Sequence, residues 1–216
     1  GNLGFDHTFN RFSIGLGYDI TALSYDDNYN LDGELIDNSD RDRTQQNIFA
    51  RLGYQFKSDK QAFLSLGYQD TAFDAPFDRN GFHRDSSGFN AAVGVDFSLT
   101  GVLSGDVSLN YREREYDDPR LESIDGWGMG AGLTWMPTTL TTVRGTISTS
   151  IEDTTQATSS GYFRTMYSLR ADHELLRNLQ ISAQLSYYVN DYELLPDAPE
   201  GAREEDTYFT ADFGAT

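Results

Sequence analysis

The sequence predicts an all-β protein built from long antiparallel strands, and three observations lead to this fold class. Apolar and polar residues alternate along most of the 216-residue chain, which is the two-residue period of a strand. The 20 Gly and 5 Pro suit a chain with many strands and turns. The alternating segments are also separated by links that are short and long in turn.

The alternation defines about eleven strands. In the second of them Phe12, Ile14 and Leu16 are separated by Ser13 and Gly15, so one face is apolar and the other is polar. The alternating segments cover residues 3–9, 12–21, 47–56, 62–68, 89–99, 107–111, 127–135, 143–151, 163–171, 179–189 and 209–213.

The links between these segments are of two kinds. Short links fall at residues 10–11, 57–60, 100–102, 137–139 and 175–178. Longer polar links fall at residues 26–44, 74–86, 116–124, 153–160 and 193–206. Tight turns on one rim and long polar loops on the other, joining strands of ~10 residues, are typical of outer-membrane barrels.

Soluble β-sandwiches also show alternation, but two features favour a membrane barrel. The alternating segments are about twice as long as typical sandwich strands. Their polar face carries mostly Gly, Ser, Thr, Asn, Gln and Arg, as a barrel interior does, whereas a face open to water would carry Lys and Glu. The sequence therefore predicts an antiparallel up-and-down transmembrane β-barrel.

Aromatic residues mark both ends of the apolar face, as expected for the two interfaces between lipid and water. This aromatic girdle comprises Tyr18, Tyr68, Tyr111, Trp127, Phe163 and Tyr187 near the long links, and Phe12, Phe56, Phe97 and Trp135 near the short links. No run approaches the ~20 apolar residues of a membrane helix.

Charge and composition exclude several function classes. Lys and Arg number 16 against 34 Asp and Glu, so the net charge is -18 and a nucleic acid would be repelled. The absence of Cys removes disulfides, thiol catalysis and thiolate metal sites. With 13 Tyr, 14 Phe and 2 Trp the chain is too rich in large apolar side chains for a disordered acidic segment. We expect no cofactor.

The direction of the strands predicts that residues 1–216 form a single barrel domain that is incomplete at one or both ends. The first strand reaches a short link, so it runs toward the periplasm, and the eleventh runs the same way. Single-chain bacterial barrels usually have an even number of strands and both termini in the periplasm. We therefore expect a total of twelve strands or more.

Four stretches resemble a known family, the putative β-barrel porins of proteobacterial outer membranes. They are Tyr116–Leu121, residues 132–143 (GLTWMPTTLTTV), Ser150–Thr155 and Ala171–Leu179. The resemblance spans nearly the whole chain and is strongest over residues 100–180. It implies a larger barrel, often encoded near polysaccharide biosynthesis and export genes, and it brings no catalytic residues.

Charged residues at inward-facing positions are the most informative candidate site. The set consists of Arg51, Asp96, Asp106, Arg112, Arg114, Arg144, Arg164, Arg170 and Asp172. One interpretation is a basic strip that guides an anionic solute or sugar chain. The other, which we favour, is that these arginines pair with the aspartates and fill a polar interior.

Two further patterns carry weaker hypotheses. One predicted strand has no inward side chains, because its inward positions are Gly126, Gly128, Gly130 and Gly132. This gap either makes room for a plug or polymer, or it accommodates bulky neighbours such as Phe63 and Tyr162 or a bend of the wall. We favour the explanation by bulky neighbours or a bend.

The loop at residues 28–34 imitates the start of a calcium loop, with candidate ligands Asn28, Asn30 and Asp32. Its twelfth position is Ser39 rather than Glu, so we expect no metal there and acidic loops that stay solvated or share divalent ions with lipopolysaccharide.

Two rival functions remain open. A hydrolytic barrel has little support, because His7 and His173 fall on lipid-facing positions and only His83 with Asp85 forms an acid–base pair. A closed or plugged barrel that acts as a scaffold in an envelope complex is the stronger rival, because inward Phe49, Phe63, Tyr162 and Tyr188 could fill the lumen.

The sequence thus predicts an integral protein of the bacterial outer membrane that is not an enzyme. We expect a porin-like channel for passive or export-linked passage of a polar solute or polysaccharide. Its expected partners are the lipid bilayer and lipopolysaccharide, together with a polysaccharide or an envelope export complex, and no nucleic acid.

Overall fold

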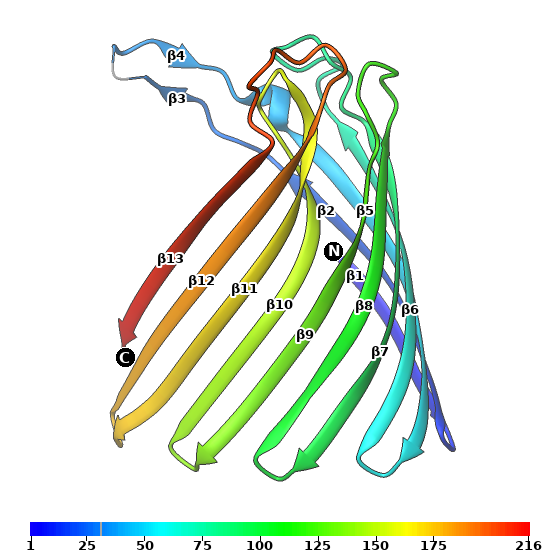
Figure 1. Cartoon of the computed structure of the whole chain (residues 1–216), viewed down its shortest axis with the longest axis vertical. Helices are drawn as coiled ribbons and strands as arrows, with labels where there is room; N and C mark the ends of the chain where they lie inside the picture. The colour runs from blue at the N-terminus through cyan, green and yellow to red at the C-terminus, as the bar shows by residue number, and fades with distance from the viewer. Residues whose placement is uncertain (31) are drawn as a thin grey trace.

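One long antiparallel sheet makes up most of the molecule in the computed structural model, which describes residues 1–30 and 32–216. The sheet has eleven strands in the order β1-β2-β5-β6-β7-β8-β9-β10-β11-β12-β13, and every strand pairs with its neighbour along the chain, as in an up-and-down barrel (Figure 1). The strands are β1 Asn2–Phe9, β2 Phe12–Leu23, β5 Arg43–Lys57, β6 Lys60–Phe73, β7 Ser86–Thr100, β8 Leu103–Tyr116, β9 Ile124–Thr138, β10 Thr141–Asp153, β11 Ser159–Leu176, β12 Leu179–Leu194 and β13 Glu205–Ala215.

The register of the strands explains the alternation in the sequence. On one face Leu16, Ala50 and Leu66 lie side by side on β2, β5 and β6, and the row continues through Ala91, Tyr111 and Trp127. The next row, on the opposite face, holds Gly15, Arg51, Ser65, Ala92, Asn110 and Gly128. Leu16, Leu66 and Trp127 are exposed to the surroundings, so the apolar face is the outer one and the polar face lines the interior.

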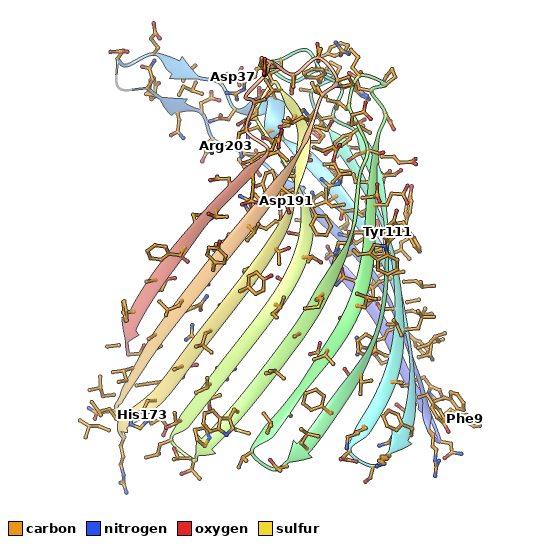
Figure 2. All side chains as sticks on the ribbon, viewed as in Figure 1. Phe9, Asp37, Tyr111, His173, Asp191 and Arg203 are labelled. Atoms are coloured by element: carbon orange, nitrogen blue, oxygen red, sulfur yellow. The ribbon has the colours of Figure 1, made fainter. Side chains whose placement is uncertain are left out.

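The two rims differ as the link lengths predict. At the lower rim in Figure 1 the strands are joined by tight turns, and Asn10 in the first of them has a positive φ of 55°, a conformation that Asn tolerates well. Strand β9 continues through Pro137 to Thr138, so the turn to β10 lies at residues 139–140 rather than 137–139. Figure 2 places Phe9 and His173 near this rim and Asp37 and Arg203 near the other.

Long loops cover the upper rim. The loop between β2 and β5 contains a short hairpin, β3 Asn28–Tyr29 and β4 Leu35–Ile36, followed by a 3-10 turn η1 at Ser39–Arg41. This hairpin projects away from the other loops (Figure 1). Among the described residues no helix has the length and hydropathy needed to cross a membrane.

The sheet is not closed on itself among the described strands, because β1 and β13 have no pairing between them. Each strand is antiparallel to its neighbours, so the first and the eleventh strand of the sheet run in the same direction. Both therefore run from the long-loop rim to the short-turn rim.

Strands β9 and β10 separate in their upper halves. Their pairing ends at Ile147 with Ala131, although β10 continues to Asp153 and β9 begins at Ile124. Strand β10 instead stays paired with β11 up to Asp153 opposite Gly161. Figure 1 shows the two strands diverging above their paired segment, with the yellow end of the β10–β11 hairpin lying among the loops of the upper rim.

The upper β10–β11 hairpin, defined here as residues 148–163, folds over the inner face of β9. Thr149 donates a hydrogen bond of 2.8 Å to Oδ1 of Asn110, an interior residue of β8. Phe163 lies against the inner face of β9, where its ring comes within 3.1 Å of the place a Cβ on Gly126 would occupy. The hairpin therefore reaches across β9 into the mouth of the barrel.

Most residues predicted for the aromatic girdle lie on the outer face of the sheet. Tyr68, Trp127 and Tyr187 are exposed there, Trp127 near the long-loop end of β9 and Tyr187 midway along β12, and Figure 2 shows Tyr111 on the upper part of the wall. Phe12, Phe56 and Trp135 are exposed near the short turns. The assignment of Phe163 to the girdle is wrong, because the inward turn of the upper hairpin carries this ring away from the lipid face.

Candidate functional site

The lower part of the interior face carries an ion pair that spans three strands. Both oxygens of Asp96 on β7 accept hydrogen bonds from Nη2 of Arg51 on β5, at 2.7 and 2.8 Å. The Arg51 guanidinium also lies over the Phe63 ring of β6, 3.5 Å from its centre, a cation–π contact. Both charged side chains remain partly exposed to the lumen, so the pair lines the interior without filling it.

A second charged cluster lies on β10 and β11. Arg144 and Arg170 stand directly opposite each other in the register, and both bind the same carboxylate of Asp172. The carboxylate is 8% exposed, whereas the two arginine side chains are 51% and 45% exposed. Two cations on one anion leave a positive charge that faces the lumen.

The remaining charged residues of the predicted set lie at different heights of the same face. Asp106 stands opposite Asp96 and beside Gly132, and no salt bridge involves it among the described residues. Arg112 lies opposite Asn90 and Gly126. Arg164 donates to Oδ1 of Asn190 at 2.9 Å and to the Tyr162 hydroxyl at 2.8 Å.

Arg114 joins the wall to the upper hairpin. It donates to Oδ1 of Asp153 at 2.9 Å and to the carbonyl oxygen of Ile151 at 3.0 Å. The second oxygen of Asp153 lies 3.6 Å from Nη2 of Arg43 on β5. Asp153 therefore joins residues from two distant parts of the wall, which places the end of the hairpin across the mouth.

The loop after β6 holds the same hairpin from another side. Arg84 is buried, and its Nη1 donates to the carbonyl oxygen of Ser160 at 2.8 Å, while its Nε donates to Asp78 at 2.8 Å. Sequence reasoning missed Arg43, Arg84 and Asp153, because all three lie at strand ends or in loops where the alternation gives no information.

The glycines of β9 make this arrangement sterically feasible. A Cβ at Gly128 would lie 2.5 Å from the Thr149 side chain, so the hairpin approaches the backbone of β9 too closely for any larger residue. The bulky neighbours of these glycines therefore differ from the predicted ones, Phe63 and Tyr162. Phe63 packs beside Gly94 instead, and Phe163 rather than Tyr162 lies on Gly126.

Aromatic side chains occupy part of the interior without meeting at one level. Phe49 lies over Gly17 and stays 48% exposed. Tyr162 and Tyr188 each pair with a ring of the next strand, Tyr192 at 5.0 Å and Tyr208 at 4.6 Å between centres. Phe63 is buried under Arg51.

Ion pairs order the loops of the upper rim. Asp118 accepts hydrogen bonds from the Arg120 side chain and backbone and from the backbone N–H of His83. The Arg120 guanidinium, together with these backbone donors, holds the pKa of the Asp118 carboxyl well below its usual range. Arg79 binds Asp40 in a bidentate ion pair, in which Nε and Nη2 each donate to one carboxylate oxygen at 2.9 Å. This pair lowers the pKa of the Asp40 carboxyl in the same way.

This lowered pKa predicts a dependence of loop order on pH. A carboxyl whose pKa is lower in the folded than in the unfolded state stabilises the fold above its unfolded pKa, and the effect is lost as the pH falls toward the folded value. We expect the backbone amide of His83 to keep constant protection from hydrogen exchange between about pH 5 and 8, and the protection to decline progressively as the pH falls below about 4, the unfolded pKa of an Asp carboxyl. In the D118N variant the protection should be weaker and independent of pH; an identical profile in both proteins would contradict the assignment.

The calcium-like loop uses its polar side chains within the β3–β4 hairpin. Oδ1 of Asn30 accepts hydrogen bonds from the backbone N–H groups of Asp32 and Glu34, and its amide donates to the Glu34 carboxylate. Asn28 pairs through its backbone with Ile36. A different group, His83 with Asp85 and Asp117, has ligand atoms within 4.8 Å of one another.

The histidines are scattered rather than gathered into a catalytic site. His7 on β1 stands opposite Ile14 on the outer face. His173 lies near the lower rim, where its Nδ1 is 2.9 Å from the Thr141 hydroxyl. His83 contacts Asp85 at 3.3 Å in an upper loop, far along the chain from the other two.

A comparison with protein families shows to which family this chain belongs. The family model described as putative beta-barrel porin 2 matches residues 1–216, the whole chain. The chain belongs to this family. No curated protein matches the sequence. Among solved structures, the Pseudomonas putida toluene transporter TodX is similar at 13% identity and a TM-score of 0.44, over 97% of this chain and 72% of TodX.

Membership of the porin family agrees with the architecture. The all-β fold and the antiparallel sheet are confirmed, and the family relationship drawn from the sequence is confirmed over its full length. The chain is thus a β-barrel protein of the porin type. The solute that such a barrel would pass does not follow from the family.

Proposed function

We propose that the protein is an integral channel of the bacterial outer membrane for a polar solute or polysaccharide, whose passage is passive or linked to export. The observation that carries this proposal is the sorting of side chains between the two faces of the sheet. The outer face is apolar and exposed, whereas the inner face presents partly exposed charged groups such as Arg51, Arg144 and Arg170. Outer-membrane channels have this arrangement.

We further propose that residues 1–216 form one barrel domain that an odd number of additional strands closes. Strands β1 and β13 both offer an unpaired edge, and in lipid every backbone polar group needs a partner. Since the two strands run in the same direction, one further antiparallel strand, or three, would fit between them. Twelve strands is then the smallest closed barrel, and the lumen would be wider than a packed interior.

The selectivity of the channel tests the role of the lumen arginines. In the double variant R144Q/R170Q the cluster around Asp172 changes from a net positive to a net negative charge. We expect the reversal potential in a salt gradient to shift toward cation preference. The control R177Q removes one positive charge from the turn between β11 and β12. If it shifts the potential by half as much as the double variant or more, or if the double variant shifts nothing, the arginines only fill the interior.

A plugged scaffold barrel is the second candidate function, and the upper hairpin favours it. Asp153, Arg43 and Arg114 hold this hairpin across the mouth. The proposed partners of either form are the lipid bilayer and lipopolysaccharide at the outer face and rim, with a polysaccharide or an envelope export complex as the larger partner. We propose no enzymatic role and no cofactor.

A further inference from the structure

Two pairs of tyrosine rings lie on the interior face of the neighbouring strands β11, β12 and β13. Tyr162 on β11 pairs with Tyr192 on β12, with 5.0 Å between the ring centres, and Tyr188 on β12 stacks on Tyr208 of β13 at 4.6 Å. The register places all four side chains on the same face as Arg164. The two pairs stand four residues apart along β12, a distance of ~13 Å in a strand.

The guanidinium of Arg164 joins the two pairs into one row. Its Cζ lies 5.0 Å from the centre of the Tyr162 ring and 5.6 Å from the centre of the Tyr188 ring, so it makes a cation–π contact with each pair. Nε donates to Asn190 and Nη2 donates to the Tyr162 hydroxyl, which fixes the side chain. Nη1 makes no hydrogen bond to the described residues and remains accessible. We call Arg164 and the four tyrosines the tyrosine row.

The tyrosine row is open to the lumen. Tyr162, Tyr188 and Tyr192 are partly exposed, and Tyr208 is 38% exposed. The hydroxyls of Tyr188 and Tyr192 make no hydrogen bond within the part of the chain that the structure describes, and neither is buried. At the upper end Tyr162 lines a polar cavity of about 210 Å³ between the loops of the mouth. The row therefore begins where a solute would enter or leave.

The chemistry of the tyrosine row suits a carbohydrate better than an ion. The CH groups of a sugar ring pack on an aromatic face, while its hydroxyls need polar groups beside that face, and a tyrosine supplies both. Charged groups of both signs flank the rings, because the partly exposed Asp206 lies on β13 opposite Asn190, next to Arg164. Mixed charges favour neither a cation nor an anion, whereas a hydroxyl donates to a carboxylate and accepts from a guanidinium.

We propose that the tyrosine row is a binding track for an uncharged saccharide chain that passes along this wall of the lumen. Sugar rings stack on the exposed tyrosine faces, and their hydroxyls bind Nη1 of Arg164 and the hydroxyls of Tyr188 and Tyr192. Since the two ring pairs are ~13 Å apart, they contact different sugar units of one chain, and a chain binds more tightly than a single sugar. The inference rests on the proposed function, because it names the class of solute that the channel takes.

Titration calorimetry on the whole folded protein, in a detergent without a sugar headgroup, tests the track. The probes are maltotetraose and cellotetraose, which differ in the linkage between their glucose units. We expect saturable binding of at least one of them, and binding of glucose that is about tenfold weaker or more. A polyethylene glycol of similar length has ether oxygens but no sugar ring, so it should not bind.

Substitution of Tyr188 locates the binding. The Y188L variant should weaken binding of the tetrasaccharide about tenfold, because it removes an aromatic face, whereas Y188F keeps the ring and should retain most of the affinity. The matched control is Y187L. Tyr187 is the next residue of β12 and pairs with Tyr167 of β11 in the same way, but on the outer face. Its substitution should leave binding unchanged.

A second variant covers the case in which Y188L does not fold. Tyr208 is more exposed than its partner and lies on β13, which pairs with β12 alone among the described strands. We expect Y208L to weaken binding of the tetrasaccharide severalfold in a protein that remains folded. Absence of binding of both tetrasaccharides, equal binding of the polyethylene glycol, or an equal loss in Y187L would overturn the proposal.

The outcome is separable from that of the channel itself. Ion conductance without binding of either tetrasaccharide would overturn the track and leave the proposed channel standing, with tyrosines that only pack against one another. Tetrasaccharide binding that Y188L or Y208L weakens, in a protein that conducts no ions, would support the track and overturn the channel.

Discussion

Replacing residues 154–158 by two glycines should raise the single-channel conductance of the protein severalfold. These residues form the tip of the upper hairpin, which Asp153 holds against Arg43 and Arg114 across the mouth. Since the conductance of a wide pore is limited by its narrowest section, removal of an obstruction there has a large effect. Recordings in a planar bilayer at fixed salt measure it.

A matched deletion separates obstruction of the mouth from general loosening of the loops. The β3–β4 hairpin belongs to the same rim but projects away from the mouth (Figure 1). Shortening it by a similar number of residues should leave the conductance unchanged. If neither shortened protein differs from the native one in conductance, the upper hairpin does not narrow the channel. The interpretation of this hairpin as a plug is then wrong.

The second large effect concerns Gly128 on β9. Its replacement by Leu places a Cβ 2.5 Å from the Thr149 side chain and 2.8 Å from Oδ1 of Asn110, two groups that are hydrogen-bonded to each other. Overpacking of this kind costs about 1–3 kcal/mol. We expect the G128L variant to unfold at a lower temperature and to conduct more than the native protein, because the hairpin is displaced.

Gly145 supplies the control for this substitution. It lies on β10 with no atom within 4 Å of its ideal Cβ, on the face that we assign to lipid. The G145L variant should keep the native unfolding temperature, measured by the loss of the compact form on gel electrophoresis after heating. Equal destabilisation in both variants would mean that leucine weakens the strands themselves and that close packing on β9 is not the cause.

Much of the fold could be predicted because alternation is a local signal. Strand β2, for example, alternates from Phe12 onward, and the structure pairs it with β1 and β5 in the register that puts its apolar residues on one face. The rims could be predicted for the same reason, since a two-residue turn and a nineteen-residue link are visible in the sequence. Even so, the β3–β4 hairpin was not expected, because two-residue strands leave no period to detect.

The inward turn of β10 and β11 could not be predicted from alternation. Ile147, Thr149 and Ile151 continue the pattern without a break, although β10 leaves β9 after Ile147. The period shows which residues share a face of their own strand; it does not show which surface that face meets. The glycines of β9 were the available signal, and their meaning depends on knowing that Thr149 and Phe163 lie on them.

Ion pairing inside the lumen follows from both the sequence and the register. The sequence placed Arg144, Arg170 and Asp172 on one face, and the register brings the two arginines opposite each other. Which arginine binds which aspartate depended on side-chain reach across strands, as with Arg51 and Asp96, two strands apart. Arg114 instead pairs with Asp153 of the upper hairpin, a partner that the face pattern alone could not identify.

The most direct test of the proposed channel is the conductance of the whole purified protein in a planar bilayer with a salt gradient across it. The net positive cluster of Arg144, Arg170 and Asp172 on the lumen face predicts steady single-channel steps and a reversal potential displaced toward anion preference. Silence across the voltage range, from protein shown to be folded, would contradict the channel and leave the plugged scaffold as its replacement.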